Sequence, residues 1–426
     1  MSQTRAPGPT LGEAVLPRYD GQSLFNLPAS ICETLGVSGS GLGPPLDPTV
    51  LPPALRDGAQ AVLLLVVDGL GAWQLEAALT AGDAPVLAAF AARARSSAGD
   101  VSLRTITSVF PSSTIPALAT LGTGRSPAAH GLLGWTVYLE EFGEAAELAR
   151  WGPAAGRGSY QDARLGGHDP IRFLGVETLH QRLARDGVES AVVCLAAFRG
   201  SGLSAMTFQG AEFLGCHAAS SILVRVEQRL ARRRRDERLY LYAYWDLLDT
   251  VSHHDGPLGA EHAAELAALD VALGRWLARH QGRGDLLVLL TADHGHVPSD
   301  PARTVRLEGE RRLLADLRSP PTGERRLAYL HARSGRRDAV RAYCADRLAA
   351  VAEWVEPTEA LDRGWLGPGP VSAAARRRVG DGLLVARSDH QLVYPFSPDR
   401  AQPPFAGNHG ALDPREMLVP LIALRV

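Results

Sequence analysis

The sequence contains no lysine, so all 44 of its basic residues are arginine. Enzymes that form a Schiff base on lysine are therefore excluded, pyridoxal phosphate enzymes among them. A Walker-type phosphate-binding loop is excluded as well, because its lysine contacts the β- and γ-phosphates of the nucleotide. Whatever chemistry the chain performs must rest on other groups.

Cysteine and net charge are also low. Cys32, Cys194, Cys216 and Cys344 include no C-x-x-C pair, which predicts reduced thiols and excludes a zinc finger or a disulfide framework. A net charge of −2 gives no general attraction to nucleic-acid polymers or anionic lipid. With no basic and apolar leader and no apolar run of membrane-spanning length, we expect a cytoplasmic protein without membrane association. Its oligomeric state cannot be read from these features.

Five short apolar runs recur along the chain, with helical or loop segments between them. They cover residues 61–67, 190–196, 239–245, 285–291 and 417–424. Continuous runs of this kind are typical of strands buried on both faces, as in a parallel sheet between helices. The sequence therefore predicts an α/β fold with a largely parallel central sheet covered by helices on both faces.

Residues 298–405 differ in composition from the rest of the chain, with many Arg, Pro and Gly and only short apolar segments. We interpret them as an inserted cap, because the apolar run at 417–424 suits a return to the central sheet. The predicted core then comprises residues 1–297 and 406–426. An independent C-terminal domain is the alternative, but it would leave the last strand without a sheet.

Acidic residues and histidines follow several predicted strands at the point where each strand ends. In an open α/β sheet, ligands bind at the carboxyl ends of the strands, where these segments meet. One aspartate before a glycine is an ordinary turn, but four such segments in one chain predict a site. The residues concerned are Asp68, Asp249, His253, Asp293, His294 and His409.

This mixture of carboxylates and imidazoles indicates a kind of metal. Asp and His ligands suit Zn²⁺ or Mn²⁺ better than Ca²⁺ or Mg²⁺, which take oxygen ligands. Six ligands are too many for one catalytic zinc that keeps an open position, so two divalent transition metal ions are predicted. Zn²⁺ is the preferred identity, with Mn²⁺ or Fe²⁺ as alternatives.

Two other residues in the stretch DLLDTVSHHDG resemble ligands. Asp246 lies close to Asp249, and His254 directly follows His253. The four-residue spacing of Asp249 and His253 places both on one face of a helical turn, whereas His254 points about 100° away. Asp249 and His253 are therefore the predicted pair.

The stretch SVFPSSTIPALATLGTGRSPAAHG, residues 108–131, is rich in hydroxyl side chains. Its prolines, apolar run and glycines predict a loop, a short helix and a second loop. A Ser or Thr at a helix start more often caps the helix than acts as a nucleophile. The residues of this stretch alone leave both roles open.

Together these segments resemble the alkaline phosphatase superfamily, and most closely its nucleotide pyrophosphatase/phosphodiesterase branch. The matching stretches follow the family's order from about residue 61 to the C-terminus, and they are VVDGLG, FPSSTIPALATLGTGRSPAAHGL, DLLDTVSHHDGP, TADHG and GNHG. The resemblance implies a metal-dependent hydrolase of phosphoric diesters or pyrophosphates with a small phosphate-ester substrate. The family also inserts extra elements between His294 and His409, in agreement with the predicted cap.

The resemblance also implies roles for individual residues. Thr114, two residues before the Pro of its motif, becomes the nucleophile that forms a covalent phosphothreonine. Two sets of metal ligands follow, the first being Asp68, Thr114, Asp293 and His294, and the second Asp249, His253 and His409.

Three positions depart from the nucleotide-hydrolysing members of the family. Ile115 stands where those members carry an aromatic that stacks on a base, and Ala117 stands where they carry Asn. Trp135 replaces an Asn that donates to the phosphoryl oxygen, and loss of such a donor costs roughly 3 kcal/mol unless another group replaces it. Ile115 and Trp135 are the predicted substrate-binding positions, and Trp135 offers an indole N–H or a stacking surface.

Related hydrolases are alternatives. A phosphomonoesterase or a phosphonate hydrolase shares the two-metal core, and a monoester dianion would need a further cation, for which Arg104, Arg125 and Arg172 are candidates. A sulfatase is disfavoured because no Cys occupies the nucleophile position.

Two readings belong to other classes. A catalytically inactive metal-binding scaffold is disfavoured, because the full set of costly buried carboxylates is retained. A dinucleotide-binding site at VVDGLGAW is disfavoured as well, because the third glycine is missing and an acidic residue precedes the other two.

Overall fold

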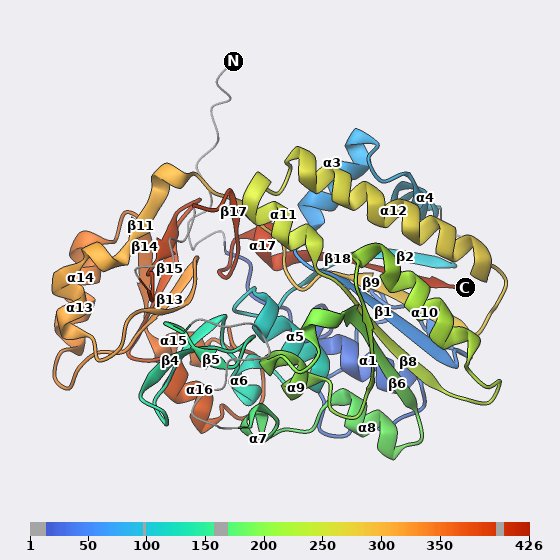
Figure 1. The fold of residues 1–426 in the computed structure, drawn as a ribbon, viewed down its shortest axis with the longest axis horizontal. Coiled ribbons are helices and arrows are strands. Elements are labelled where there is room, and N and C mark those ends of the chain that lie inside the picture. The colour runs from blue at the N-terminus through green and yellow to red at the C-terminus, as the bar shows by residue number, and fades with distance from the viewer. Residues whose placement is uncertain (1–13, 97–98, 157–168, 398–403) are drawn as a thin grey trace.

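The computed structural model of the chain describes residues 14–96, 99–156, 169–397 and 404–426. Two seven-stranded sheets dominate this part of the protein, the larger one on the right of Figure 1 and the second on the left. The first thirteen residues, on which the expectation of a missing leader partly depends, lie outside the described part.

The central sheet has the strand order β2-β18-β9-β1-β8-β6-β7. Neighbouring strands from β9 to β7 are parallel, while β18 pairs antiparallel with both β9 and β2. This arrangement confirms the predicted fold class. The strands are β1 (Ala61–Val67), β2 (Val101–Thr107), β6 (Glu189–Leu195), β7 (Glu212–Cys216), β8 (Leu239–Trp245), β9 (Leu286–Thr291) and β18 (Leu418–Arg425).

Burial explains which strands the apolar pattern of the sequence predicts. Every residue of β1, β8 and β9 is buried, so each strand is a continuous apolar run. The middle of β2 is exposed and contains Arg104, and most of β7 is only half buried. Neither strand is therefore a continuous apolar run in the sequence.

Helices cover both faces of the central sheet. In Figure 1, α3 (Ala72–Ala81), α4 (Pro85–Arg95) and α12 (Ala260–His280) lie above it, and α1 (Leu27–Thr34), α5 (Thr114–Thr123) and α8 (Leu179–Arg185) lie below it. The remaining helices are α2 (Pro53–Arg56), α6 (Pro127–His130), α7 (Pro170–Leu174), α9 (Gly202–Thr207), α10 (Ile222–Ala231), α11 (Leu247–Asp255), α13 (Arg311–Asp316), α14 (Arg337–Arg347), α15 (Pro357–Asp362), α16 (Ala373–Arg378) and α17 (Pro414–Met417).

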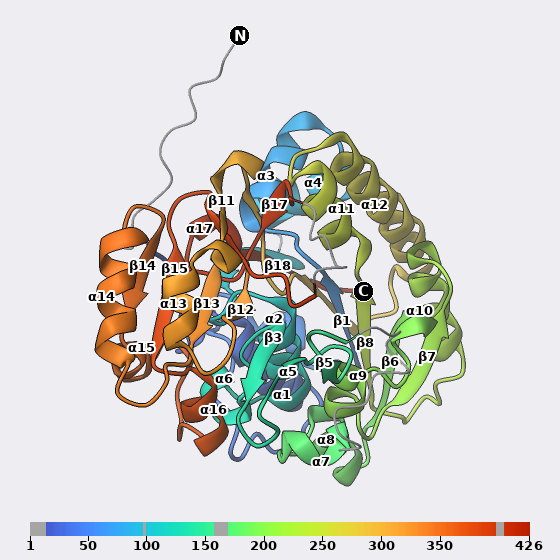
Figure 2. The ribbon, with the colours of Figure 1, turned by 60° about the vertical axis from the view of Figure 1, so that its left-hand side comes forward.

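The second sheet is antiparallel throughout, with the order β14-β15-β13-β12-β3-β4-β5 (Figure 2). Its strands are β3 (Thr136–Leu139), β4 (Glu144–Glu147), β5 (Gly152–Pro153), β12 (Thr322–Glu324), β13 (Leu327–Leu330), β14 (Ala352–Val355) and β15 (Gly382–Ala386). Four of these strands belong to the segment 298–405, and β3 to β5 come from the predicted core. The division at 298–405 stays a prediction, and the sheet itself is built from both parts.

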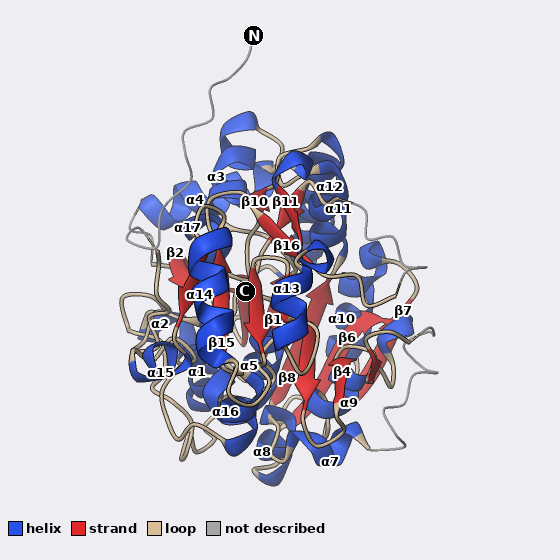
Figure 3. Ribbon diagram, turned by 90° about the vertical axis from the view of Figure 1, so that its left-hand side faces the viewer, coloured by secondary structure: helices blue, strands red, loops and turns tan. Residues whose placement is uncertain are grey.

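The second sheet buries both of its faces. On β13, Leu327 and Tyr329 pack in one apolar cluster with Trp365, whereas Ala328 and Leu330 pack in another. Successive side chains of a strand point to opposite faces, so this alternation gives the sheet two small cores. Helices α13 and α14 lie over the second face, in front of the strands in Figure 3.

Two short strand pairs complete the described fold. β10 (Val297–Pro298) pairs antiparallel with β17 (Gly407–Asn408), and β11 (Thr304–Arg306) pairs in parallel with β16 (Gln391–Val393).

No single helix in the described ranges is long and apolar enough to span a membrane. Helices α3 and α4 reach that length and composition only as a pair, across a bend of 105°.

Candidate metal and active site

The predicted ligands meet at one edge of the central sheet. Asp68 follows β1, Asp293 and His294 follow β9, and Asp249 and His253 lie on α11 directly after β8. The strand β18 runs antiparallel to its neighbours, so the segment before it, which carries His409, reaches the same edge. The pairing of β10 with β17 ties the chain after His294 to the chain before His409.

Three side chains lie close to the Nε2 atom of His294. It lies 3.2 Å from the Thr114 hydroxyl oxygen, 3.4 Å from Asp68 Oδ1 and 3.5 Å from Asp293 Oδ2. In a tetrahedral zinc site with bonds of about 2.0–2.1 Å, ligand atoms lie about 3.3 Å apart. The three separations from His294 Nε2 therefore fit those between ligands of one metal ion.

The hydrogen bonds of the two carboxylates support this fit. Asp68 Oδ2 accepts from the hydroxyl of Tyr244, and Asp293 Oδ1 accepts from the backbone N–H groups of Gly69 and His294 at 3.1 and 3.0 Å. Asp68 Oδ1 and Asp293 Oδ2 are buried and have no hydrogen-bond partner among the described residues. Buried acceptors of this kind need a cation or a donor, and both face His294 Nε2.

A second group gathers around Asp249 Oδ1. His253 Nε2 lies 3.4 Å from this oxygen and His409 Nε2 lies 3.7 Å from it. The Nδ1 atoms of these histidines lie 2.8 Å and 3.1 Å from the carbonyl oxygens of Gly407 and Ser112, and each N–H can donate there. Such bonds orient imidazole rings toward a metal and leave Nε2 as the ligand atom.

His296 is a site residue that the sequence interpretation missed. Its Nε2 lies 2.8 Å from Asp249 Oδ1, and it joins Asp249, His253 and His409 in a group that could hold a metal ion. A separation of 2.8 Å suits a hydrogen bond better than two ligands of one tetrahedral ion. The D-H-x-H spacing after β9 was the available signal, because both histidines follow the same strand end.

Asp246 and His254 lie outside the possible metal-binding groups of the described residues. Asp246 is the N-cap residue of α11, and burial raises its pKa to about 6. His254 packs its ring against Phe405, with ring centroids 5.5 Å apart.

Burial favours neutral imidazoles in this site, and it shifts the pKa values of the two carboxylates Asp68 and Asp249 in opposite directions once their neighbours are included. Burial lowers the pKa of His253, and it lowers the pKa of His409 well below the usual range. Burial, with the charges of Asp293 and Asp249, raises the pKa of Asp68 well above its ordinary value. Burial also acts to raise the pKa of Asp249, but the surrounding histidines hold it well below its ordinary value. Neutral imidazole is the form that binds metal.

Gly69 allows the two groups to approach each other. Its φ is +77°, and a Cβ there would lie 2.8 Å from His296 Nε2 and 3.0 Å from the Cα of Asp249. A side chain at this position would be strained and would collide with the site.

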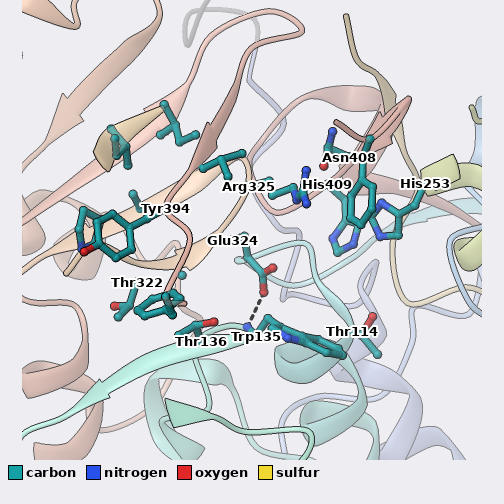
Figure 4. A pocket seen from close by; sticks show the side chains of 18 of the residues that line it. Thr114, Trp135, Thr136, His253, Thr322, Glu324, Arg325, Tyr394, Asn408 and His409 are labelled. Atoms are coloured by element: carbon teal, nitrogen blue, oxygen red, sulfur yellow. Dashed lines mark hydrogen bonds between the residues drawn. The ribbon is translucent and has the colours of Figure 1, made fainter. Parts of the chain in front are cut away.

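A cavity of about 650 Å³ opens beside Thr114, between the metal-binding groups and the second sheet (Figure 4). Its lining is mostly apolar. The lining residues are Thr114, Trp135, Thr136, Asp249, His253, Leu307, Pro321, Thr322, Gly323, Glu324, Arg325, Ala328, Leu392, Val393, Tyr394, Phe396, Phe405, Asn408 and His409.

The two predicted substrate-binding positions differ in their surroundings. Trp135 lines the cavity, and its backbone N–H donates to Glu324 Oε1 at 2.7 Å. Ile115 is fully buried in the main core and does not line this cavity. A substrate contact of Ile115 in this cavity is therefore not expected from the structure.

The second sheet contributes two charged residues that had no sequence signal, Glu324 and Arg325. The Arg325 guanidinium stacks on Phe405, 3.7 Å from the ring centroid, and donates to Gln391. Arg325 is the one arginine among the described residues that line the cavity. The predicted cations Arg104, Arg125 and Arg172 do not line it.

Comparison with known proteins identifies the family. A family profile described as "Type I phosphodiesterase / nucleotide pyrophosphatase" matches residues 62–412. The chain belongs to this family. It is accordingly a hydrolase of the phosphodiesterase and pyrophosphatase type, and its described residues contain a cluster that could bind metal. No curated protein is similar enough in sequence to match the chain.

Solved structures of this fold include two kinds of enzyme. Murine ectonucleotide pyrophosphatase/phosphodiesterase 5 shares 18% sequence identity with a TM-score of 0.63, over 85% of this chain and 87% of the murine one. Phosphonoacetate hydrolase from Sinorhizobium meliloti shares 21% identity with a TM-score of 0.59, over 85% of this chain and 89% of the bacterial one. At these identities the likeness is one of fold.

Proposed function

We propose that this enzyme hydrolyses phosphoric diesters or pyrophosphates through a covalent phosphothreonine on Thr114. The observation that carries the proposal is the position of the Thr114 hydroxyl, 3.2 Å from His294 Nε2 and on the wall of the cavity. A nucleophile must be reachable by substrate and close to the groups that activate it.

The start of α5 favours an anion beside Thr114. The N-cap residue Ser113 makes no side-chain cap, because its hydroxyl donates to Glu324 instead of accepting from the helix backbone. The backbone N–H groups of Thr114 and Ile115 at this helix start consequently have no side-chain cap among the described residues, and the helix dipole attracts negative charge. A phosphoryl group bound there would place its phosphorus within reach of the Thr114 oxygen.

The reaction has two displacements at phosphorus. In the first, the Thr114 oxygen forms a bond to phosphorus while the bond to the leaving oxygen breaks; the proton of the threonine hydroxyl passes to solvent, and solvent protonates the leaving oxygen. In the second, water attacks the phosphothreonine, which restores the threonine hydroxyl and releases the phosphate monoester.

The proposal includes two divalent transition metal ions, with Zn²⁺ as the identity that mixed carboxylate and imidazole ligands favour. The first group, formed by Asp68, Thr114, Asp293 and His294, would hold one ion. Asp249, His253 and His409 would hold the other, with His296 orienting Asp249. Bound metal would lower the pKa of the Thr114 hydroxyl and stabilise negative charge on phosphoryl and leaving oxygens.

A structural relative supports the role of threonine. An inactive form of the murine ectonucleotide pyrophosphatase/phosphodiesterase, in which a threonine is replaced by alanine, has been solved in complex with AMP. By analogy, Thr114 would attack phosphorus in this chain, and the cavity would bind the group that is esterified to the phosphate. Tyr394, Phe396 and Phe405 offer that substituent an aromatic surface.

A phosphonate hydrolase is the second candidate, favoured by one specific feature. Arg325 places a guanidinium in the same cavity as Thr114, and a phosphonate substrate with a second anionic group needs such a cation. Turnover of phosphonoacetate, compared with that of diesters under the same conditions, separates this candidate from the first.

The deciding measurement compares bis(p-nitrophenyl) phosphate with p-nitrophenyl phosphate on zinc-loaded protein, with Thr114→Ala as the blank. We expect the diester to be preferred and the activity to vanish in the blank. A monoester preference would refute the diesterase assignment, and normal turnover by Thr114→Ala would refute the nucleophile.

A further inference from the structure

Glu324 brings a carboxylate from the second sheet to the side of the nucleophile. It ends β12, and in Figure 4 it lies between His409 and Trp135. Its Oε1 atom accepts from the Ser113 hydroxyl at 2.5 Å and from the Trp135 backbone N–H at 2.7 Å. Both donors come from the segment that contains Thr114 and the loop after it.

The backbone around Glu324 is shaped to receive this side chain. Gly410 has a φ of +123°, and a Cβ there would lie 2.6 Å from the Cβ of Glu324. Gly134 has a φ of +154°, and a Cβ there would lie 3.3 Å from Glu324 Oε1. The loop after His409 and the loop before β3 thus close on Glu324, so the carboxylate has little freedom to leave the cavity.

The position of the carboxylate opposes a highly charged phosphate. The Ser113 hydroxyl and the backbone N–H of Trp135 already donate to Glu324, so a phosphoryl oxygen beside Thr114 would have to compete for them. A second anion beside Thr114 must therefore bind next to a carboxylate and compete with it for donors. The energetic penalty grows with the charge of the incoming group.

Phosphate esters differ in this charge. A diester carries one negative charge at neutral pH, whereas a monoester with its second pKa near 6 carries close to two. Burial raises the pKa of Glu324 to about 7, even though its two donors act to lower it, so the carboxylate is charged at pH 8. At that pH the repulsion distinguishes diesters from monoesters.

We propose that Glu324 is a specificity-determining residue, whose carboxylate excludes dianionic phosphate groups and so selects diesters over monoesters and inorganic phosphate. This inference rests on the proposed function, and it assigns the selection to one side chain of the second sheet. Glu324 and Arg325 are consecutive residues and both line the cavity, so a carboxylate and a guanidinium lie in it together.

The test uses binding, so that it does not depend on turnover. Zinc-loaded Thr114→Ala protein is compared with the Thr114→Ala/Glu324→Gln double variant at pH 8, by titration calorimetry with inorganic phosphate and with bis(p-nitrophenyl) phosphate. Gln keeps an oxygen acceptor for Ser113 and Trp135 and removes the charge. We expect phosphate to bind about tenfold more tightly to the double variant, about 1.4 kcal/mol, and the diester to change less than threefold.

Two further variants separate charge from structure. Glu353→Gln removes a carboxylate from β14 of the same sheet, where Glu353 pairs with Arg387 outside the cavity, and it should leave both affinities unchanged. Ser113→Ala removes one hydrogen bond to Glu324 but keeps its charge, and it should not improve phosphate binding. If Ser113→Ala matches Glu324→Gln, the effect is structural and the proposal fails.

The remaining outcomes are also decisive. If Glu324→Gln tightens the binding of phosphate and of the diester equally, the assignment of Glu324 is wrong. It is also wrong if the substitution does not tighten phosphate binding. If the wild-type enzyme hydrolyses no diester, the proposed function fails, while the phosphate comparison still reports on Glu324. In the active enzyme, Glu324→Gln should raise kcat/KM for p-nitrophenyl phosphate relative to that for bis(p-nitrophenyl) phosphate by a similar factor.

Discussion

Arg326 and Glu416 form a buried ion pair that joins the second sheet to the loop carrying His409. Arg326 Nε lies 3.0 and 3.1 Å from the two carboxylate oxygens of Glu416, and the side chains are 2% and 0% exposed. Glu416 also accepts from the backbone N–H of Ala411, two residues after His409. This pair therefore positions Glu324 and His409 relative to each other.

Glu416→Gln should destabilise the protein strongly. Removing one partner of a buried ion pair leaves the other charge unpaired, and we expect the free energy of unfolding to fall by about 3 kcal/mol. Denaturant unfolding measures this change. Glu359→Gln is the matched control, because its pair with Arg363 is about half exposed and should contribute less than about 1 kcal/mol. Equal effects of the two substitutions would contradict a role for burial.

Asp249→Ala should reduce bound metal more than any other single change on α11. Asp249 lies within reach of one possible metal position with His253, His296 and His409 and of another with Asp68 and His294, whereas Asp246 and His254 lie near neither. We expect metal content after dialysis to fall by more than half in Asp249→Ala and to stay near the wild-type level in Asp246→Ala and His254→Ala. Loss of metal in either control would show that the wrong residues of this helix were chosen.

Tyr244→Phe should weaken metal binding without removing a ligand. The Tyr244 hydroxyl donates to Asp68 Oδ2, and outer hydrogen bonds of this kind typically contribute about tenfold or more to metal affinity. Competition with a chelator measures the affinity. Tyr242→Phe on the same strand is the control, because the buried Tyr242 hydroxyl has no hydrogen-bond partner among the described residues. A similar loss in both variants would assign the effect to packing.

His180 should make stability fall in acid. It is buried beneath Tyr240, and burial lowers its pKa to about 3, compared with about 6.5 in an unfolded chain. Between these values the unfolded state binds the extra proton. Neutral His180 therefore makes its full contribution to the free energy of unfolding above pH 6.5. As the pH falls from 6.5 toward 3, this free energy decreases by about 1.4 kcal/mol per pH unit.

The variant His180→Asn should show a shallower fall in the free energy of unfolding between pH 6.5 and pH 4. The exposed His217→Asn serves as the reference. Parallel pH profiles of wild type and His180→Asn would mean that another group controls acid stability.

Local pattern was enough to predict five of the seven strands of the central sheet and the proximity of Asp249 and His253. Runs such as 61–67 and 239–245 are strands because residues buried on both faces must be apolar at every position. The pair Asp249 and His253 shares a helix face because of its four-residue spacing. The antiparallel direction of β18 carried no such signal, since a continuous apolar run reads the same in either direction.

The amino-acid sequence by itself determined the fold class, the strand ends that carry the predicted ligands and the family. The tertiary structure alone decided that Glu324 bonds to Ser113 next to Thr114, that His296 contacts Asp249 and that Ile115 is buried in the core. The physical reason is distance along the chain. Glu324 and Ser113 are 211 residues apart, and no periodicity encodes which side chain a second sheet will deliver to a cavity.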